Sequence, residues 1–237
     1  MPGIGVIGGT GFAEWDEFEV EETEEKHTPW GSPSSPLYRG TLKEKKIVLL
    51  KRHGPDHDLP PHRINHRANL YALQKEVDEL IGICSAGALR EDFKVPSISI
   101  PKDYVNFWNP ITFYNEEIKH VTPELSSSLR EELIKASEET GKDVDDDGIY
   151  VQTQGPRLET KAEVKVLADF GDLVGMTMAS EATLSKEAAV DYAAVVSVDN
   201  YANGVEDETV DYEEIVDTAK ENWENIKTIL ERSLERR

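Results

Sequence analysis

Short apolar runs that end in small or polar residues recur along the 237-residue chain. Runs of this kind predict buried β-strands over 4–7, 46–51, 79–84, 95–100, 149–153, 173–176 and 193–198. Apolar residues at helical spacing predict helices over 69–77, 125–139, 161–170, 180–190 and 212–235, and an acidic loop is expected over 142–148. Strands that alternate with helices predict one α/β domain over residues 1–237, with a mostly parallel sheet covered by helices.

The first of these strands ends in a glycine-rich loop, Gly8-Gly9-Thr10-Gly11. Glycines let successive backbone N–H groups converge on an anion, and the Thr10 hydroxyl adds a donor, so the loop can cradle a phosphate. A plain tight turn explains the same residues equally well. The loop matches neither the Walker pattern nor the dinucleotide-binding pattern.

The second strand is followed at once by Arg52 and His53. Arginine offers a planar fork for phosphate oxygens, and histidine adds a donor that can carry charge near neutral pH. A solvated strand end is the alternative. His53, His57, His62 and His66 fall within fourteen residues, which raises the question of a metal site. Prolines between them break any helix, so a structured loop is favoured and no metal is expected.

Three later segments carry further candidates. A Gly-Pro turn delivers Glu159 where a predicted helix begins, Met176 and Thr177 end another strand, and Asn200 follows the last one. Ligand sites in open α/β sheets lie at such strand ends. Each residue also has an ordinary explanation. Glu159 can interact with the helix dipole, Met176 and Thr177 can belong to the core, and Asn200 can serve a turn.

Composition narrows the class of protein. The chain has 47 acidic and 26 basic residues and a net charge of −21, which disfavours nucleic-acid binding by long-range repulsion. Such a surface suits a salty cytoplasm, although an ordinary acidic protein fits equally well. The lone Cys84 excludes an intramolecular disulfide, and a buried inert thiol is expected. No apolar run approaches the roughly 20 residues that span a bilayer, and the start lacks a basic leader, so a cytoplasmic protein with no membrane contact is expected.

Taken together and in order, these motifs resemble those of the methylthioadenosine and purine nucleoside phosphorylase family of the trimeric type. The resemblance runs along nearly the whole chain, through 7–12, 52–54, 65–70, 85–87, 155–157, 175–177 and Asn200. It implies an α/β fold with a central mixed sheet flanked by helices. It also implies a homotrimer or dimer of trimers with sites near subunit interfaces, and a purine-salvage pentosyltransferase that needs no metal or organic cofactor. Its ligands would be a purine nucleoside and the co-substrate inorganic phosphate.

The resemblance also implies roles for particular residues. Phosphate would be bound by Gly9, Thr10, Arg52, His53, Ser85 and Thr177. The nucleoside would be bound by Leu158, Glu159, Val174, Met176, Asn200, Tyr212 and His120. Met176 would lie against the ribose, Tyr212 would lie near the 5′ substituent, and His120 would reach a neighbouring subunit's site. Cys84 stands where relatives usually have Thr or Asn, so no phosphate contact is expected from its side chain.

Glu159 and Asn200, the two residues expected to be catalytic, also bear on the choice of base. Asn200 can donate to O6 or N7 of a 6-oxopurine, and the Glu159 carboxylate can accept from N1–H. Adenine-selective relatives carry aspartate and a small residue at these two positions. The expected substrates are therefore inosine and guanosine, with 5′-methylthioinosine also considered. The alternatives are a methylthioadenosine phosphorylase and a non-catalytic nucleoside-binding protein. A nucleoside hydrolase is disfavoured, because such enzymes commonly rely on aspartate-bound calcium.

Overall fold

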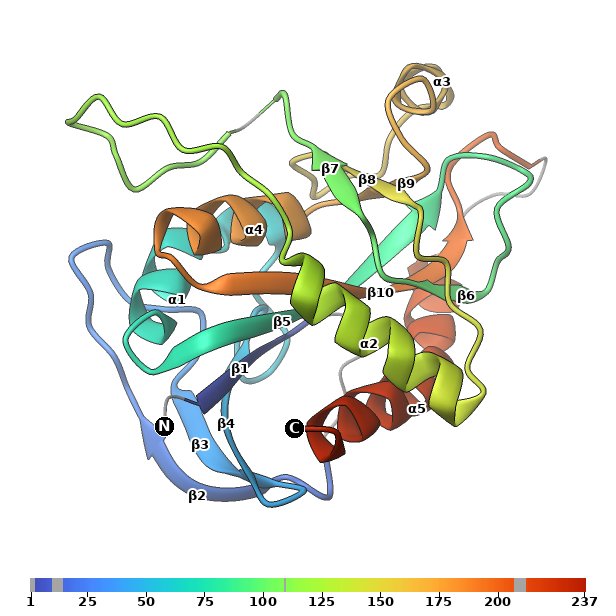
Figure 1. Cartoon of the computed structure of the whole chain (residues 1–237). Coiled ribbons are helices and arrows are strands. Elements are labelled where there is room, and N and C mark those ends of the chain that lie inside the picture. Colours follow the sequence, from blue (N-terminus) through green and yellow to red (C-terminus); the bar gives the residue numbers. More distant parts are fainter. Residues whose placement is uncertain (1–2, 10–14, 109, 207–211) are drawn as a thin grey trace.

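A computed structural model describes residues 3–9, 15–108, 110–206 and 212–237, except the side chains of residues 212 and 214. The described residues form one ten-stranded mixed sheet flanked by helices (Figure 1). Its strands are β1 (Gly3–Gly8), β2 (Glu19–Glu24), β3 (Leu37–Leu42), β4 (Lys45–Lys51), β5 (Val77–Ala88), β6 (Ser97–Ser99), β7 (Asp103–Val105), β8 (Ile149–Gln152), β9 (Leu173–Gly175) and β10 (Asp191–Tyr201). The helices are α1 (His66–Leu73), α2 (Ser127–Thr140), α3 (Lys161–Leu167), α4 (Met178–Glu187), α5 (Tyr212–Glu235) and the short 3-10 helix η1 (Pro61–Arg63).

The sheet has the order β2-β3-β4-β1-β5-β9-β8-β7, with β10 paired to β5 and β6 paired to β10. The strands β4, β1, β5 and β10 run parallel, as do β7, β8 and β9. The pairs β2–β3, β3–β4, β5–β9 and β6–β10 are antiparallel. The mixed sheet implied by the family resemblance is therefore confirmed, and the mostly parallel sheet expected from alternation alone is not.

The sequence pattern missed β2, β3 and β7. Strand β2 has the sequence EVEETE and its side chains are mostly exposed, so it has no apolar face for a pattern to reveal. It pairs with β3, which returns into β4 through a turn at Lys43 and Glu44, both at positive φ. These two antiparallel additions at the sheet edge account for much of the departure from a parallel sheet.

The predicted helices all form; α5 has the predicted bounds, and the others have shifted ends. Helix α1 starts at His66 rather than at 69, because the Asn65 side chain caps it by accepting from the N–H of Ala68. It ends at Leu73, which leaves Val77 free to begin the 12-residue strand β5. Local capping therefore decided boundaries that apolar spacing alone placed several residues away.

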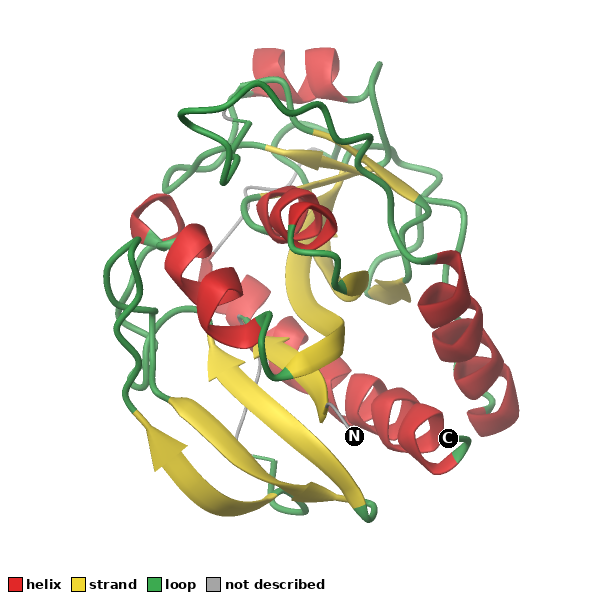
Figure 2. Ribbon diagram, turned by 60° about the vertical axis from the view of Figure 1, so that its left-hand side comes forward, coloured by secondary structure: helices red, strands yellow, loops and turns green. Residues whose placement is uncertain are grey.

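Two apolar cores lie on opposite faces of the sheet. One is formed with α1 and α4 and includes Leu70 and Met178. The other is formed with α2 and α5 and includes Leu133 and Trp223. Figure 2 shows the strands between these helix layers, while α3 projects beyond them in Figure 1. The parallel strands share one carboxyl edge, where polar residues replace the apolar runs, so a ligand site is expected there. None of the described helices is long and apolar enough to span a membrane.

Candidate functional site

A cavity of about 560 Å³ opens at the carboxyl ends of β4, β5 and β10. This volume is typical of a site for a small ligand. The structure brings nine of the residues predicted from sequence to its wall: Arg52, His53, Ser85, Leu158, Glu159, Val174, Met176, Thr177 and Asn200. No phosphate- or nucleoside-binding role was predicted for the other lining residues: His57, Asp58, Leu59, Pro60, Pro61, Ala86, Gly87, Pro156, Gly175, Ala202, Asn203 and Ile215.

Arg52 closes one end of the cavity with a guanidinium that is already paired. Only 1% of Arg52 is exposed, and it donates from Nε and Nη2 to the two carboxylate oxygens of fully buried Glu181, at 2.5 and 2.9 Å. Its Nη1 donates to the Ile83 carbonyl oxygen at 2.7 Å. Burial is the largest single influence on the pKa of Arg52 and lowers it, but the charge and hydrogen bond of Glu181, with Cys84 and Tyr192, together raise it, and the net shift is upward. Arg52 is therefore a rigidly held cation whose charge is balanced by the carboxylate of Glu181.

Gly9 is required by this packing. A Cβ at this position would lie 2.1 Å from Nη1 of Arg52 and 2.5 Å from the Ile83 carbonyl oxygen, so a larger residue would displace the arginine. Gly9 itself is not among the residues that line the cavity. Thr10, its predicted companion in phosphate binding, lies outside the described residues.

His53 lies beside Arg52 as a neutral ring. Burial, with the nearby Arg52 charge, lowers the pKa of His53 to about 3, so the expected charge near neutral pH is absent from the ligand-free protein. Its Nδ1 lies 2.8 Å from the Leu59 carbonyl oxygen. A carbonyl can only accept, so Nδ1 carries the proton and Nε2 is the acceptor of the neutral ring. The ring centroids of His53 and His57 are 4.7 Å apart, yet no group of three metal-ligating side chains exists in the described part of the chain.

Thr177 lines the cavity, and Cys84 lies beside it without lining the cavity. The Thr177 hydroxyl donates to Cys84 Sγ at 3.8 Å, and Arg52 Nη2 donates to the same sulfur at 3.5 Å. Burial raises the pKa of Cys84 to about 11, so the thiol stays protonated at neutral pH. It is the inert buried thiol that was expected.

Glu159 lines the same cavity and does not cap a helix. Thr160 is the N-cap of α3, and the capping box joins Thr160 to Glu163, so Glu159 precedes the helix. Glu159 is only 8% exposed and accepts a 2.6 Å hydrogen bond at Oε1 from the Thr153 hydroxyl. Asn203 Nδ2 donates to the Glu159 backbone carbonyl at 3.1 Å, which ties this segment to the residues after β10.

The turn before Glu159 depends on Gly155. This glycine has φ of +66°, and a Cβ there would lie 2.3 Å from Sδ of Met176. Glycine is therefore needed both for the backbone conformation and for the close approach to the second predicted segment. The two segments that stood out in the sequence thus touch each other at the cavity.

Asn200 reaches the cavity because β10 contains an irregularity. The pairing with β5 shifts between Val198 and Asn200, so that Asn200 lies opposite Gly87. Its Nδ2 donates to the Tyr201 carbonyl oxygen at 2.6 Å. A Cβ at Gly87 would lie 3.4 Å from that Nδ2, so the asparagine side chain lies close over the bare strand backbone.

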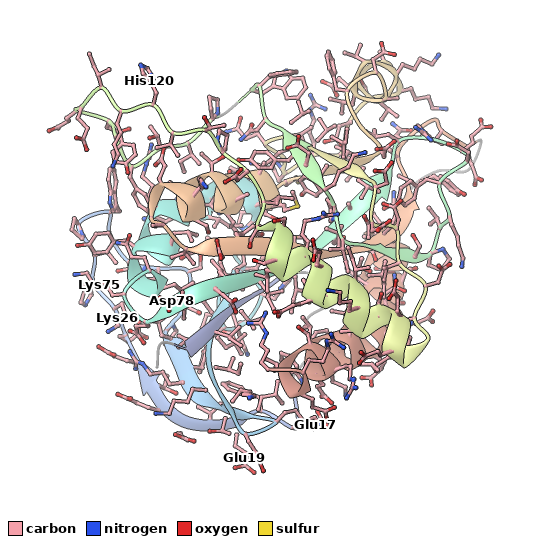
Figure 3. All side chains as sticks on the ribbon, in the orientation of Figure 1. Glu17, Glu19, Lys26, Lys75, Asp78 and His120 are labelled. Carbon is pink, nitrogen blue, oxygen red and sulfur yellow. The ribbon has the colours of Figure 1, made fainter. Side chains whose placement is uncertain are left out.

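Besides Gly9 and Thr10, two further predicted residues, Tyr212 and His120, are not among the described residues that line this cavity. Tyr212 begins α5, but its side chain lies outside the described set. Ile215, three residues further along the same helix, is buried and does line the cavity. His120 is exposed on the long segment that joins β7 to α2, and Figure 3 places it far out on that projection. Its predicted contact with a neighbouring subunit stays a prediction.

Comparison with known proteins gives a consistent result. A family model described as "Phosphorylase superfamily" matches residues 3–235. A protein of Archaeoglobus fulgidus named probable 6-oxopurine nucleoside phosphorylase is 43% identical, over 98% of this chain and 96% of the relative. The S-methyl-5′-thioadenosine phosphorylase of Pyrococcus horikoshii is 34% identical, over 99% and 92%. A probable S-methyl-5′-thioinosine phosphorylase of Methanocaldococcus jannaschii is 37% identical, over 96% and 90%.

Solved structures share the fold. The methylthioadenosine phosphorylase of Schistosoma mansoni, solved with adenine, superposes with a TM-score of 0.90 at 24% identity, over 99% of this chain and 91% of that one. A methylthioadenosine phosphorylase from an antarctic soil metagenomic library gives 0.89 at 26% identity, over 98% and 85%. The arrangement of sheet and helix layers is thus shared with proteins of known structure.

Proposed function

The chain belongs to the phosphorylase superfamily, and we propose that it is a nucleoside phosphorylase that cleaves 6-oxopurine nucleosides with inorganic phosphate. One observation carries the choice of substrate. Glu159 and Asn200 line the same cavity as Arg52, His53 and Thr177. A base-recognition end and an anion end therefore share one space of nucleoside size. The 43% identical relative named for 6-oxopurine nucleosides supports the same assignment.

Base selection follows from hydrogen-bond polarity. A carboxylate has two acceptor oxygens, so Glu159 keeps the capacity to accept from a purine N1–H after it has accepted from Thr153. The Asn200 amide has two N–H donors, so one remains for O6 or N7 of the base after the bond to Tyr201. Adenine has no N1–H, so it would leave the buried carboxylate without its donor, at a cost of about 1–3 kcal/mol.

Phosphate is proposed to bind near Thr177, Ser85 and His53. The Thr177 hydroxyl can turn from Cys84 Sγ to donate to a phosphate oxygen, and His53 Nε2 can accept from a protonated one. Arg52 supplies a fixed positive field, which Glu181 keeps from being an unpaired buried charge. Because Arg52 is committed to internal hydrogen bonds, its part is proposed to be mainly electrostatic.

The reaction follows from this placement. The bond between C1′ and N9 breaks, and its electron pair goes to the purine. A phosphate oxygen then forms the new bond to C1′, and the proton that the phosphate gives up passes to the purine, which gives ribose 1-phosphate and free base. The sugar passes through an oxocarbenium-like state, which the adjacent anion stabilises. Asn200 stabilises the charge that builds on the leaving purine, and no covalent enzyme intermediate is needed.

A second candidate is phosphorolysis of methylthio nucleosides. Ile215 presents an apolar, buried side chain to the cavity, which suits a 5′-methylthio group better than a 5′-hydroxyl. Relatives at 34% and 37% identity are named for methylthioadenosine and methylthioinosine. Of these two, methylthioinosine is compatible with Glu159 and Asn200, so it is included among the proposed substrates.

The assembly is proposed to be a homotrimer or a dimer of trimers without metal or organic cofactor. Phe107, Trp108 and Phe170 are exposed, and Phe107 makes edge-type ring contacts with the other two, beside a second hollow that shares Glu159 with the cavity. An apolar patch of this kind is typical of a subunit interface. Mass from light scattering and activity after EDTA treatment test the two statements: a monomer contradicts the first, and loss of activity contradicts the second.

A substrate panel tests the proposed reaction. Release of free base is measured with inosine, guanosine, methylthioinosine and methylthioadenosine, each with and without phosphate. We expect phosphate-dependent release from the 6-oxopurine nucleosides. Preference for methylthioadenosine would overturn the roles of Glu159 and Asn200. Release without phosphate indicates a hydrolase, and binding without release indicates a nucleoside-binding protein.

A further inference from the structure

A second buried carboxylate, Asp199, lies next to the cavity without lining it. Asp199 is 5% exposed and directly precedes Asn200. It occupies the position at which the pairing of β10 with β5 shifts. Val198 pairs with Ala86 and Asn200 pairs with Gly87, so Asp199 has no pairing partner across the strand. Such an extra residue bends a strand and re-aims its neighbours.

The carboxylate of Asp199 joins three elements of the fold. Ser85 on β5 donates to Oδ2, and Ser197 on β10 donates to Oδ1. Asn222 on α5 donates from Nδ2 to the Ser197 hydroxyl at 2.8 Å and to the Ser97 carbonyl oxygen at 3.2 Å. We call Ser85, Asp199, Ser197 and Asn222 the Asp199 network.

The network reaches the cavity on three sides. Ser85 lines it at the proposed phosphate end, and Asn200 lines it at the base end. Helix α5, which holds Asn222, also carries Ile215 into the wall. A change in the position of Asp199 therefore moves the phosphate end, the base end and the helix together. The proposed reaction needs these groups in register on one nucleoside.

We propose that Asp199 is a positioning residue that sets the distance between the phosphate end and the base end of the cavity. The inference rests on the proposed phosphorolysis. The ionised carboxylate accepts from Ser85 and Ser197 at once and so fixes both strands at the irregularity. If the Asp199 carboxylate had no positioning role, its charge would affect the reaction only by repelling phosphate.

The surroundings of Asp199 add a pH dependence. The groups that face Asp199 from β5, β10 and α5 are the uncharged Ser85, Ser197 and Asn222. Burial is the main cause of the shift in the pKa of Asp199, which is raised to about 6. Below that pH the carboxyl carries a proton and must itself donate, so one serine hydroxyl has to turn away. Positioning is therefore complete above a pH of about 6 and is lost below it.

The test compares wild type with Asp199→Asn and Asp199→Ala. For Asp199→Ala we expect kcat/KM to fall about 100-fold for both phosphate and inosine, because misplacement by about 1 Å costs that much. For Asp199→Asn we expect a smaller loss at pH 8 and no decline attributable to this group as the pH falls through 6. The titration of phosphate itself is common to all the proteins and cancels in ratios between them. Melting temperature at pH 7 should not fall in Asp199→Asn, which shows that the loss is not unfolding.

Matched controls separate positioning from general damage. Asp191 lies exposed at the start of the same strand, so Asp191→Asn should leave kinetics and pH profile unchanged. Ser85→Ala removes only the phosphate-end arm of the network. It should raise KM for phosphate without changing selectivity among bases, whereas Asp199→Ala changes both.

The outcomes distinguish this inference from the proposed function. A wild type without phosphorolysis overturns the proposed function and this inference with it. If the wild type is active but Asp199→Asn binds phosphate more tightly at every pH, only this inference is overturned, because tighter binding indicates simple repulsion of phosphate by Asp199. The same holds if both Asp199 variants keep wild-type kinetics and the same decline of activity at acid pH.

Discussion

The two ends of the cavity are built in different ways. At the phosphate end, Arg52 is held by fully buried Glu181 and by the backbone of two strands. At the base end, Glu159 and Asn200 are each held by a single side-chain hydrogen bond within a few residues of the sequence, to Thr153 and Tyr201. The first end is part of the core of the molecule, and the second is attached to its edge.

The two ends therefore differ in how easily a substitution can change their function without unfolding the protein. The phosphate end cannot lose a partner without leaving an unpaired buried charge, so its chemistry is coupled to folding. The base end can exchange side chains at the cost of a hydrogen bond, so selectivity can change while the fold is kept. Relatives at similar identity that are named for different purine nucleosides are consistent with this division.

The largest effect is expected from breaking the phosphate end. Glu181→Ala leaves Arg52 buried and unpaired, and removes the acceptor of the Tyr192 hydroxyl as well. The free energy of unfolding should fall by about 3–5 kcal/mol, measured by urea denaturation. As a control, Lys186→Ala on the same helix breaks the surface pair with Glu124 and should cost about 1 kcal/mol or less. Equal costs for the two variants would contradict the proposed coupling.

The next effect belongs to the base end. Glu159→Gln replaces the acceptor for N1–H with an amide that can present a donor instead. We expect kcat/KM for inosine to fall about 5- to 150-fold, with little change in melting temperature. This fall corresponds to a loss of about 1–3 kcal/mol of transition-state stabilisation. The control Glu163→Gln keeps a residue type that is suitable for the capping box of α3 and should leave inosine turnover unchanged. A stability loss as large as that of Glu181→Ala would erase the contrast between the two ends.

A smaller change should shift selectivity rather than abolish it. Asn200→Asp replaces a donor to O6 or N7 with an acceptor, which suits the exocyclic amino group of adenine. We expect turnover of inosine to fall about 10-fold, while the ratio of methylthioadenosine to inosine turnover rises. Steady-state kinetics with both nucleosides measure this. An unchanged ratio would remove Asn200 from base recognition.

The smallest effect is expected at Thr153, which is proposed to act on the base only through Glu159. Thr153→Val removes the hydroxyl that donates to Glu159 Oε1 at 2.6 Å and keeps the side-chain shape. KM for inosine should rise about threefold, and the phosphate KM should not change, because only one orienting hydrogen bond is lost. A matched rise in both KM values would show that the two ends are not independent at this level.

Much of the fold and site was predictable from particular residues. The apolar runs identified β1, β4, β5 and β10, and the polar residues at their ends identified Arg52 and Asn200 as cavity residues. These predictions succeeded because parallel strands that are buried on both faces have continuous apolar sequences, and because ligand sites lie at the carboxyl ends of such strands. Strand β2 was missed because an exposed edge strand leaves no such signal.

The order of elements, the family resemblance and most of the residue types that line the cavity can be read from the amino-acid sequence. The protonation states and hydrogen-bond partners of those residues depend on the folded arrangement. Arg52 meets Glu181 across 129 positions, and Ser85 meets Asp199 across 114. No local pattern predicts such pairs, because they arise from packing that removes water and makes each buried polar group seek a partner wherever the chain brings one.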